Sequence, residues 1–235
     1  MTTNPIICAV DTTDVAQAKA LAGQLSGGVG ALKLGLEFFT ANGAAGVREI
    51  ASQHVPIFLD LKFHDIPNTV AGAIKATAGI DAFMMTVHTA GGSAMLRAAA
   101  GAADELAIAT GKERPQIVGV TVLTSLDQQD MQSMGVGDTL NDQVKRLAEL
   151  AQVSGLDGVV CSPHEIELLR RQCGEDFTLV VPGIRPAGSA TGDQKRVLTP
   201  KEALQKSADY LVIGRPITEA ADPAKAAREI WESLA

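Results

Sequence analysis

The sequence has few aromatic residues and few cysteines. Aromatic residues make up 3% of the 235 residues, against 46% for all hydrophobic residues, so the core must be filled by Ala, Val, Leu and Ile. Such a core suits strands packed between helices better than an antiparallel sandwich. The cysteines are Cys8, Cys161 and Cys173. An odd number without C-x-x-C spacing favours buried thiols over disulfides and predicts a reducing, cytoplasmic location.

The sequence also lacks a basic excess and a long apolar run. Its formal net charge of -7 argues against nucleic acid or an anionic membrane as the main partner. The beginning of the chain, MTTNPIICAVD, has neither a basic region nor an apolar stretch long enough for a signal peptide or a membrane span. We therefore expect a soluble protein that binds any anionic ligand in a local basic pocket.

Short apolar runs rich in β-branched residues recur along the chain, each followed by an amphipathic, Ala-rich stretch. Apolar strands alternating with helices predict parallel pairing, and eight right-handed crossovers favour closure. Residues 1–235 are thus expected to form one α/β domain, a (β/α)8 TIM barrel, with a doubly wound open sheet as the alternative. The expected strands are 6–10, 31–35, 57–62, 82–88, 117–123, 158–161, 178–182 and 210–213.

Charged residues stand near the carboxyl ends of these strands, where such barrels have their active sites. In the third strand, Asp60 and Lys62 are two residues apart, so both side chains point to one side of the sheet. Leu59 and Leu61 then point to the helices. Lys33 lies in the second strand.

Buried charges are costly unless they are paired, so Lys33, Asp60, Lys62 and Asp65 are expected to form a mutually neutralising network. The alternative is a salt-bridge cluster that only plugs the barrel. Two charged residues on the same face of a strand reduce the apolar packing of the core. This departure from ordinary core packing favours an active site over a structural salt-bridge cluster.

A phosphate site is expected after the seventh and eighth strands, where barrels often bind phosphate. The seventh strand runs into PGIRPAGS, which contains Arg185, and the eighth ends in IGRPIT, which contains Gly214 and Arg215. Glycine lets the backbone approach an anion, and arginine offers a bidentate donor. The long segment 183–196 is a candidate lid.

Several motifs in order make the chain resemble the orotidine 5'-phosphate decarboxylase family. They are AVD ending at Asp11, LKLG around Lys33, DLKFHDIPNT over 60–69, VTVLTS ending at Ser125, VVPGIRP around Arg185, and IGRPIT around Arg215. The resemblance implies a cytoplasmic enzyme of de novo pyrimidine biosynthesis that converts orotidine 5'-monophosphate into uridine monophosphate and carbon dioxide. It implies neither a cofactor nor a metal.

The resemblance also implies residue roles. Lys62 would protonate C6 of the pyrimidine as carbon dioxide leaves, Asp60 would lie against the substrate carboxylate, and Lys33 would bond Asp60 and the ribose. Asp65 and Thr69 would reach across a homodimer interface into the partner's site. The remaining substrate-binding candidates are Asp11 at the ribose, Thr124 and Ser125 at the base, Gln194, Gly214 and Arg215 at the phosphate, Arg185 near the phosphate, and Pro182.

Two alternatives remain open. One is a magnesium-dependent sugar-phosphate decarboxylase or aldolase of the same barrel group, in which a carboxylate replaces Lys33. A lysine there argues against it, because a second cation repels the metal. The other is a non-catalytic barrel that binds a nucleotide. The four histidines are scattered without metal-ligand spacing, so structural roles are favoured for them.

Overall fold

The computed structural model describes residues 4–186 and 198–234 of the chain. Its strands form a closed parallel barrel in chain order, in which β1 pairs with both β2 and β8. This confirms the TIM barrel and excludes the open sheet. The strands are β1 Ile6–Val10, β2 Ala31–Gly35, β3 Ile57–Phe63, β4 Ala82–His88, β5 Gln116–Val120, β6 Gly158–Val160, β7 Thr178–Val181 and β8 Tyr210–Ile213.

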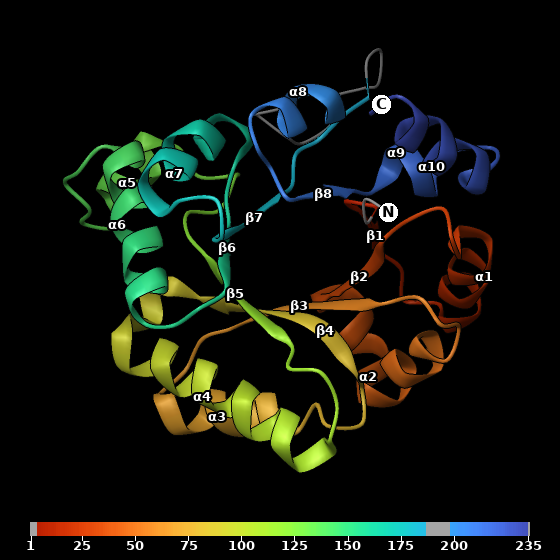
Figure 1. Cartoon of the computed structure of the whole chain (residues 1–235), viewed down its shortest axis with the longest axis horizontal. Coiled ribbons are helices and arrows are strands. Elements are labelled where there is room, and N and C mark those ends of the chain that lie inside the picture. The colour runs from red at the N-terminus through yellow and green to blue at the C-terminus, as the bar shows by residue number, and fades with distance from the viewer. Residues whose placement is uncertain (1–3, 187–197, 235) are drawn as a thin grey trace.

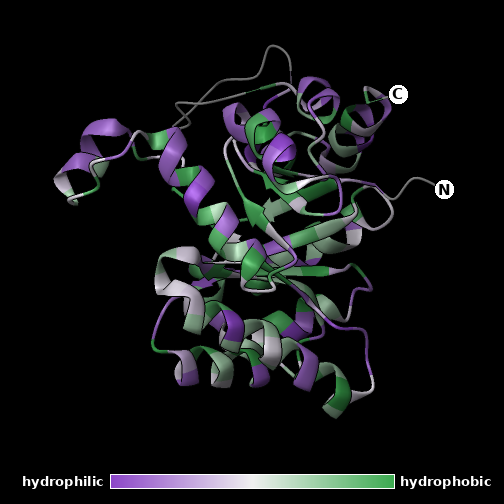
Figure 2. Cartoon of the chain, turned by 60° about the vertical axis from the view of Figure 1, so that its left-hand side comes forward, coloured by the Kyte–Doolittle hydropathy of each residue, from purple (hydrophilic) through white to green (hydrophobic). Residues whose placement is uncertain are grey.

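Helices surround the ring of strands (Figure 1). The strands are predominantly apolar, and polar residues are concentrated on the helices and loops outside them (Figure 2). The helical segments are α1 Val15–Leu25, α2 Leu36–Ala51, α3 Pro67–Lys75, η1 Thr89–Gly91, α4 Gly92–Thr110, α5 Gln128–Ser133, α6 Leu140–Val153, η2 Pro163–Glu165, α7 Ile166–Cys173, α8 Pro200–Gln205, α9 Arg215–Thr218 and α10 Pro223–Glu232. Within the described residues, no helix is long and apolar enough to cross a membrane.

The strand predictions are correct in position, with differences at some ends. Strands β1, β2, β4 and β8 have the predicted bounds, β3 is one residue longer, and β6 and β7 are each one residue shorter. The prediction for β5 was wrong at both ends, since that strand begins at Gln116 and ends at Val120. The next residues leave the ladder, and Val122 and Leu123 line a cavity at the mouth of the barrel instead.

Two apolar layers hold the barrel together. The larger lies between the strands and the helices and includes Leu59 and Leu61, as the alternation in β3 predicts. The smaller fills the barrel itself, and its fully packed members are Ile7, Ala9, Ala31, Phe58, Met84, Val118, Val180 and Val212. This inner layer supports the charged residues that follow it along the strands.

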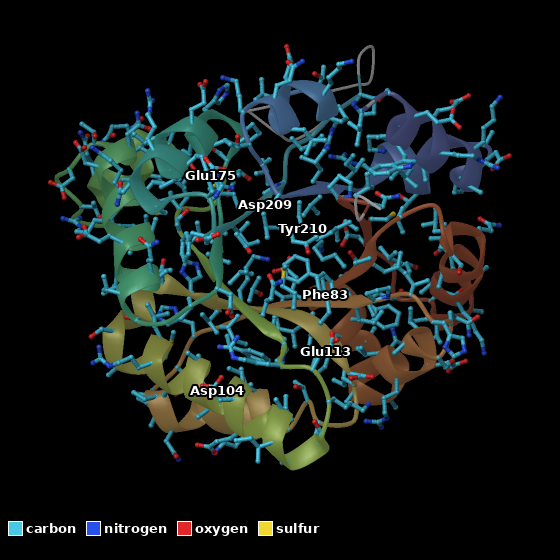
Figure 3. The ribbon with its side chains drawn as sticks, in the orientation of Figure 1. Phe83, Asp104, Glu113, Glu175, Asp209 and Tyr210 are labelled. Carbon is cyan, nitrogen blue, oxygen red and sulfur yellow. The ribbon has the colours of Figure 1, made fainter. Side chains whose placement is uncertain are left out.

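An aromatic pair closes the amino end of the barrel interior. Phe83 and Tyr210 lie within the ring of strands, with ring centroids 6.1 Å apart (Figure 3). Both pack against the inner apolar cluster. The predicted site residues that line the cavity stand at the opposite, carboxyl end of the barrel.

Candidate active site

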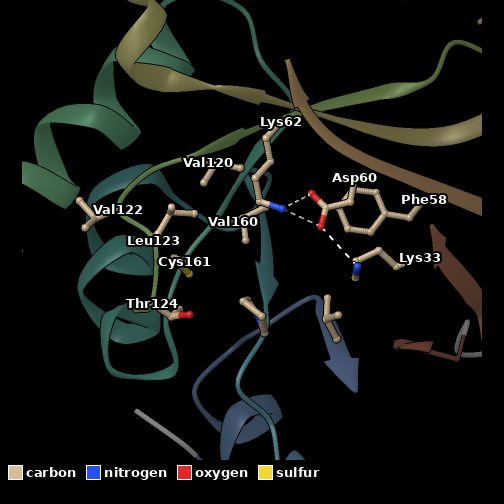
Figure 4. A pocket seen from close by; sticks show the side chains of 12 residues that line it. Lys33, Phe58, Asp60, Lys62, Val120, Val122, Leu123, Thr124, Val160 and Cys161 are labelled. Atoms are coloured by element: carbon tan, nitrogen blue, oxygen red, sulfur yellow. Dashed lines mark hydrogen bonds and ion pairs between the residues drawn. The ribbon is translucent and has the colours of Figure 1, made fainter. Parts of the chain in front are cut away.

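A chain of alternating charges crosses the mouth of the barrel. Lys62 Nζ lies 2.9 Å from both carboxylate oxygens of Asp60, and Lys33 Nζ lies 3.6 Å from Asp60 Oδ2 (Figure 4). Lys33 Nζ is also 3.4 Å from Asp11 Oδ1. The structure thus brings together Lys33 of β2, Asp60 and Lys62 of β3, and Asp11 directly after β1, with equal numbers of positive and negative groups.

Asp60 and Lys62 point to the same side of β3, as predicted, but β3 is irregular there. Leu59 pairs with Met85 and Phe63 pairs with Val87, so three residues of β3 stand opposite the single residue Thr86 of β4. Lys62 has a φ of 51°, in the left-handed region that side chains other than glycine rarely adopt. Such bulges occur next to active sites, where they redirect a side chain.

Among the four charged groups Asp11, Lys33, Asp60 and Lys62, the central carboxylate of Asp60 is the most buried. The Asp60 side chain is 11% exposed, against 30% for Lys62 and 59% for Asp11. Burial alone raises the pKa of Asp60, but the charges of Lys33 and Lys62 and hydrogen bonds from Lys62 and Thr86 outweigh burial and hold that pKa below its ordinary value. Asp60 is therefore a carboxylate at neutral pH.

A cavity beside these charges has one charged side and one apolar side (Figure 4). Its residues come from the second, third, fifth, sixth, seventh and eighth strands and the segments after them. They are Lys33, Phe58, Asp60, Lys62, Val120, Val122, Leu123, Thr124, Val160, Cys161, Pro182 and Val212. Apart from Pro182, the apolar residues were not predicted as site residues, because their sequence pattern is that of ordinary buried strands. Such a cavity can hold a planar, partly apolar ring against an ammonium group.

Asp65 and Thr69 lie outside this cluster in their own chain. Both are exposed. Asp65 Oδ1 accepts a hydrogen bond of 2.6 Å from the backbone of Ile66, and no salt bridge of Asp65 is found among the described residues. Thr69 lies in the first turn of α3. Within one chain, Lys33 and Lys62 therefore contact Asp60 as predicted, and Asp65 does not. Asp11 joins the network through its contact with Lys33.

The other predicted residues are distributed around the same end of the barrel. Thr124 and Pro182 line the cavity, and Ser125 follows in an exposed loop. Gly214 directly follows β8 and precedes Arg215, the first residue of α9.

Arg185 lies in the segment after β7. Its backbone N–H donates to Leu198 O and its guanidinium donates to Ile184 O. Gln194 and most of the candidate lid 183–196 lie outside the described residues.

Thr86 was not predicted from the sequence, although it is completely buried and touches both Asp60 and Lys62. A threonine on the same face of a strand as Met84 and His88 is a weak signal by itself. His88 stacks on His64, with ring centroids 5.4 Å apart. Among the described residues, no group of three or more His, Cys, Asp or Glu side chains is arranged to hold a metal ion.

Comparison with known proteins gives a consistent result. Residues 4–230 match the model of the orotidine 5'-phosphate decarboxylase / HUMPS family. The chain is 57% identical over 231 residues to an orotidine 5'-phosphate decarboxylase of Paramagnetospirillum magneticum, with 98% of each chain covered. It is 54% identical to that of Rhodospirillum rubrum, covering 98% of this chain and 94% of the relative. The crystal structure of the Lactobacillus acidophilus enzyme of that name superposes with a TM-score of 0.87 at 36% identity, covering 98% and 99% of the two chains.

Proposed function

The chain belongs to the orotidine 5'-phosphate decarboxylase / HUMPS family as a carboxy-lyase, and we propose that it converts orotidine 5'-monophosphate into uridine 5'-monophosphate without a cofactor. The observation that carries this proposal is the Lys62 ammonium held 2.9 Å from both oxygens of Asp60 beside an apolar wall. The three cysteines are free and buried, which supports a reducing cytoplasm as the place of action.

The chemistry requires a cation and a proton at one carbon. When carbon dioxide leaves C6 of the pyrimidine, the bonding electron pair stays on C6 in an orbital that the ring does not delocalise. We propose that the Lys62 ammonium stabilises this developing charge and then transfers a proton to C6. Lys62 becomes a neutral amine and regains its proton from solvent. Asp60 keeps the ammonium in place and lies against the substrate carboxylate.

The remainder of the substrate is assigned to groups around the mouth of the barrel. We propose that Asp11 and Lys33 bind the ribose and that Thr124, Ser125 and Pro182 face the base. Gly214 and Arg215, with Arg185 and Gln194, are assigned to the phosphate. Cavity lining by Lys33, Thr124 and Pro182 supports the first two assignments. The position of Gly214 and Arg215 directly after β8 supports the third.

We further propose that two chains complete each site. Asp65 and Thr69 are exposed in a single chain and flank Ile66, a large apolar side chain that is 66% exposed. A partner chain that covers Ile66 would bury apolar area and bring the Asp65 carboxylate toward the partner's ammonium groups. This explains why Asp65 stands outside the ion-pair chain of its own subunit.

The magnesium-dependent alternative conflicts with the position of Lys33. Its ammonium lies between Asp11 and Asp60, at 3.4 Å and 3.6 Å, where a metal held by these carboxylates would have to lie.

The test is release of carbon dioxide from orotidine 5'-monophosphate by the purified protein in excess chelator. Full activity in chelator supports the proposal. Loss of activity in chelator favours the metal-dependent alternative, and tight binding of the nucleotide without release of carbon dioxide favours a non-catalytic barrel.

A further inference from the structure

Thr86 connects the two groups on which the proposed chemistry depends. It lies in the middle of β4 and is completely buried. Its hydroxyl accepts a hydrogen bond of 2.8 Å from the backbone N–H of Lys62 and donates one of 3.0 Å to Asp60 Oδ1. A hydroxyl has one proton, so accepting from Lys62 leaves that proton for the carboxylate. Both bonds therefore have a fixed direction.

The backbone at Lys62 needs such a partner. The β3–β4 ladder is interrupted between Leu59 and Phe63, so Thr86 takes the Lys62 N–H with its side chain. Lys62 also has the left-handed φ of 51°, which costs free energy for a residue with a side chain. A strained conformation of this kind persists only where its surroundings hold it.

We propose that Thr86 is a positioning residue, which fixes the Lys62 backbone and the Asp60 carboxylate relative to each other so that the ammonium lies on both carboxylate oxygens. The inference rests on the proposed function, because Lys62 is the group that acts on the substrate. Thr86 acts through Asp60 and Lys62. It is absent from the lining of the cavity, which supports a role without substrate contact.

The test compares Thr86→Val, which removes the hydroxyl but keeps the shape, with Thr86→Ser, which keeps the hydroxyl. A hydrogen bond to a charged group is worth about a 10- to 100-fold change in rate. We expect Thr86→Val to lower kcat by about that factor, with KM within about threefold of the parent. Thr86→Ser should restore kcat to within about threefold of the parent.

Thr77→Val is the matched control. Thr77 is also buried, and its hydroxyl donates 2.7 Å to Ile74 O, away from the charged cluster. We expect the control to leave kcat unchanged. If Thr86→Val does not fold, Thr86→Ala against Thr86→Ser gives the same comparison, since only the serine variant keeps a hydroxyl.

The pH profile separates positioning from a general loss of packing. The charged groups that face Asp60 are Lys33 and Lys62, with Asp11 beyond Lys33. The hydrogen bond from Thr86 is one of the interactions that lower the pKa of Asp60. Its loss should move the acid limb of kcat to higher pH in Thr86→Val and leave that limb in place in Thr86→Ser.

Two results would overturn the inference: a kcat of Thr86→Val within about twofold of the parent, or equal losses in the serine and valine variants. Failure of the proposed function is a separate result, because the parent protein itself would then release no carbon dioxide. In that case a crystal structure of Thr86→Val tests the positioning role. It supports the role if Lys62 leaves the left-handed region and refutes it if Lys62 and its contact with Asp60 are unchanged.

Discussion

At the scale of single residues, the site depends on how buried charged groups stabilise one another. An ammonium or a carboxylate loses its hydration when it is buried, and pairing must replace that hydration. Asp60 achieves this with two ammonium groups and one hydroxyl, and its pKa stays low in spite of burial. The same arrangement holds the Lys62 side chain at the cavity, where the substrate carboxylate lies on our proposal.

His88 provides a pH-dependent prediction at this scale. Burial, the nearby His64 and the charge of Lys62 lower the pKa of His88 from its ordinary value of 6.5. The unfolded chain therefore binds a proton at His88 more readily than the folded chain does. The free energy of unfolding should decrease as the pH falls from about 6.5 to the lowered pKa that His88 has in the folded chain. Chemical denaturation between pH 7.5 and 5 should show this decrease in the parent protein and a smaller one in His88→Gln. An equal decrease in both proteins would contradict the assignment.

At the residue scale, the sequence predicts some of these contacts and not others. The like-facing pair Asp60 and Lys62 was predictable, because alternation along a strand depends only on sequence spacing. The bulge that places Thr86 between them was not, because register is a property of two strands. The place of Asp65 is a different case, since its proposed role depends on a second chain.

At the scale of elements, two similar ion pairs fasten the amino ends of neighbouring strands. Arg170 of α7 donates to Asp209, just before β8, at 2.6 Å, and Asp209 accepts the backbone N–H of Leu179 in β7. In the same way, Arg114 donates to Asp157, before β6, and Asp157 accepts the N–H of Ile117 in β5. Each pair links a strand to the beginning of the next one.

Arg170 is a buried residue of α7 and should contribute more to stability than an exposed arginine on a helix. It is 8% exposed, and its guanidinium also donates to the carbonyl groups of Gly174, Phe177 and Ser207. Arg170→Met removes the guanidinium from these carbonyl groups and the charge partner from Asp209, so we expect a loss of about 3 kcal/mol in the free energy of unfolding. The control Arg171→Met, at the exposed neighbouring position, should change it by less than about 0.5 kcal/mol. Equal effects in urea denaturation would refute this account.

The elements themselves were largely predictable, because apolar strands alternating with amphipathic helices have a strong periodic signal. The carboxyl end of β5 was not predictable. Val122 and Leu123 continue the apolar run of that strand, yet they leave the ladder to line the cavity. The hydrophobicity of a sequence does not distinguish an apolar residue in a sheet from one in the wall of a cavity, where Val122 is buried and Leu123 is 38% exposed.

At the scale of the whole molecule, the barrel has one closed end and one open end. Phe83 and Tyr210 close the amino end, and the carboxyl end carries the charged cluster and its cavity. The exposed Asp65, Ile66 and Thr69 lie just beyond the carboxyl end of β3. On our proposal, the second chain covers this segment and completes the site.

Complementation tests the shared site. Lys62→Ala and Asp65→Ala chains should each be inactive alone, but a heterodimer contains one site with native Lys62 and native Asp65. Random mixing should therefore restore about a quarter of the parent activity per site. Mixing Lys62→Ala with Lys33→Ala is the control, because both lysines contact Asp60 of their own chain and no site becomes complete. A Lys62→Ala and Asp65→Ala mixture no more active than this control would contradict the shared site.

The central claim is that the ammonium of Lys62 supports decarboxylation as both cation and proton donor. The most direct test is the rate of carbon dioxide release from orotidine 5'-monophosphate by Lys62→Ala, compared with the parent and with Lys19→Ala, a surface lysine paired with Glu49. We predict a loss of at least about 10⁴-fold in kcat for Lys62→Ala with an unchanged melting temperature, and no loss for Lys19→Ala. A folded Lys62→Ala protein that retains kcat within about tenfold of the parent would contradict the claim.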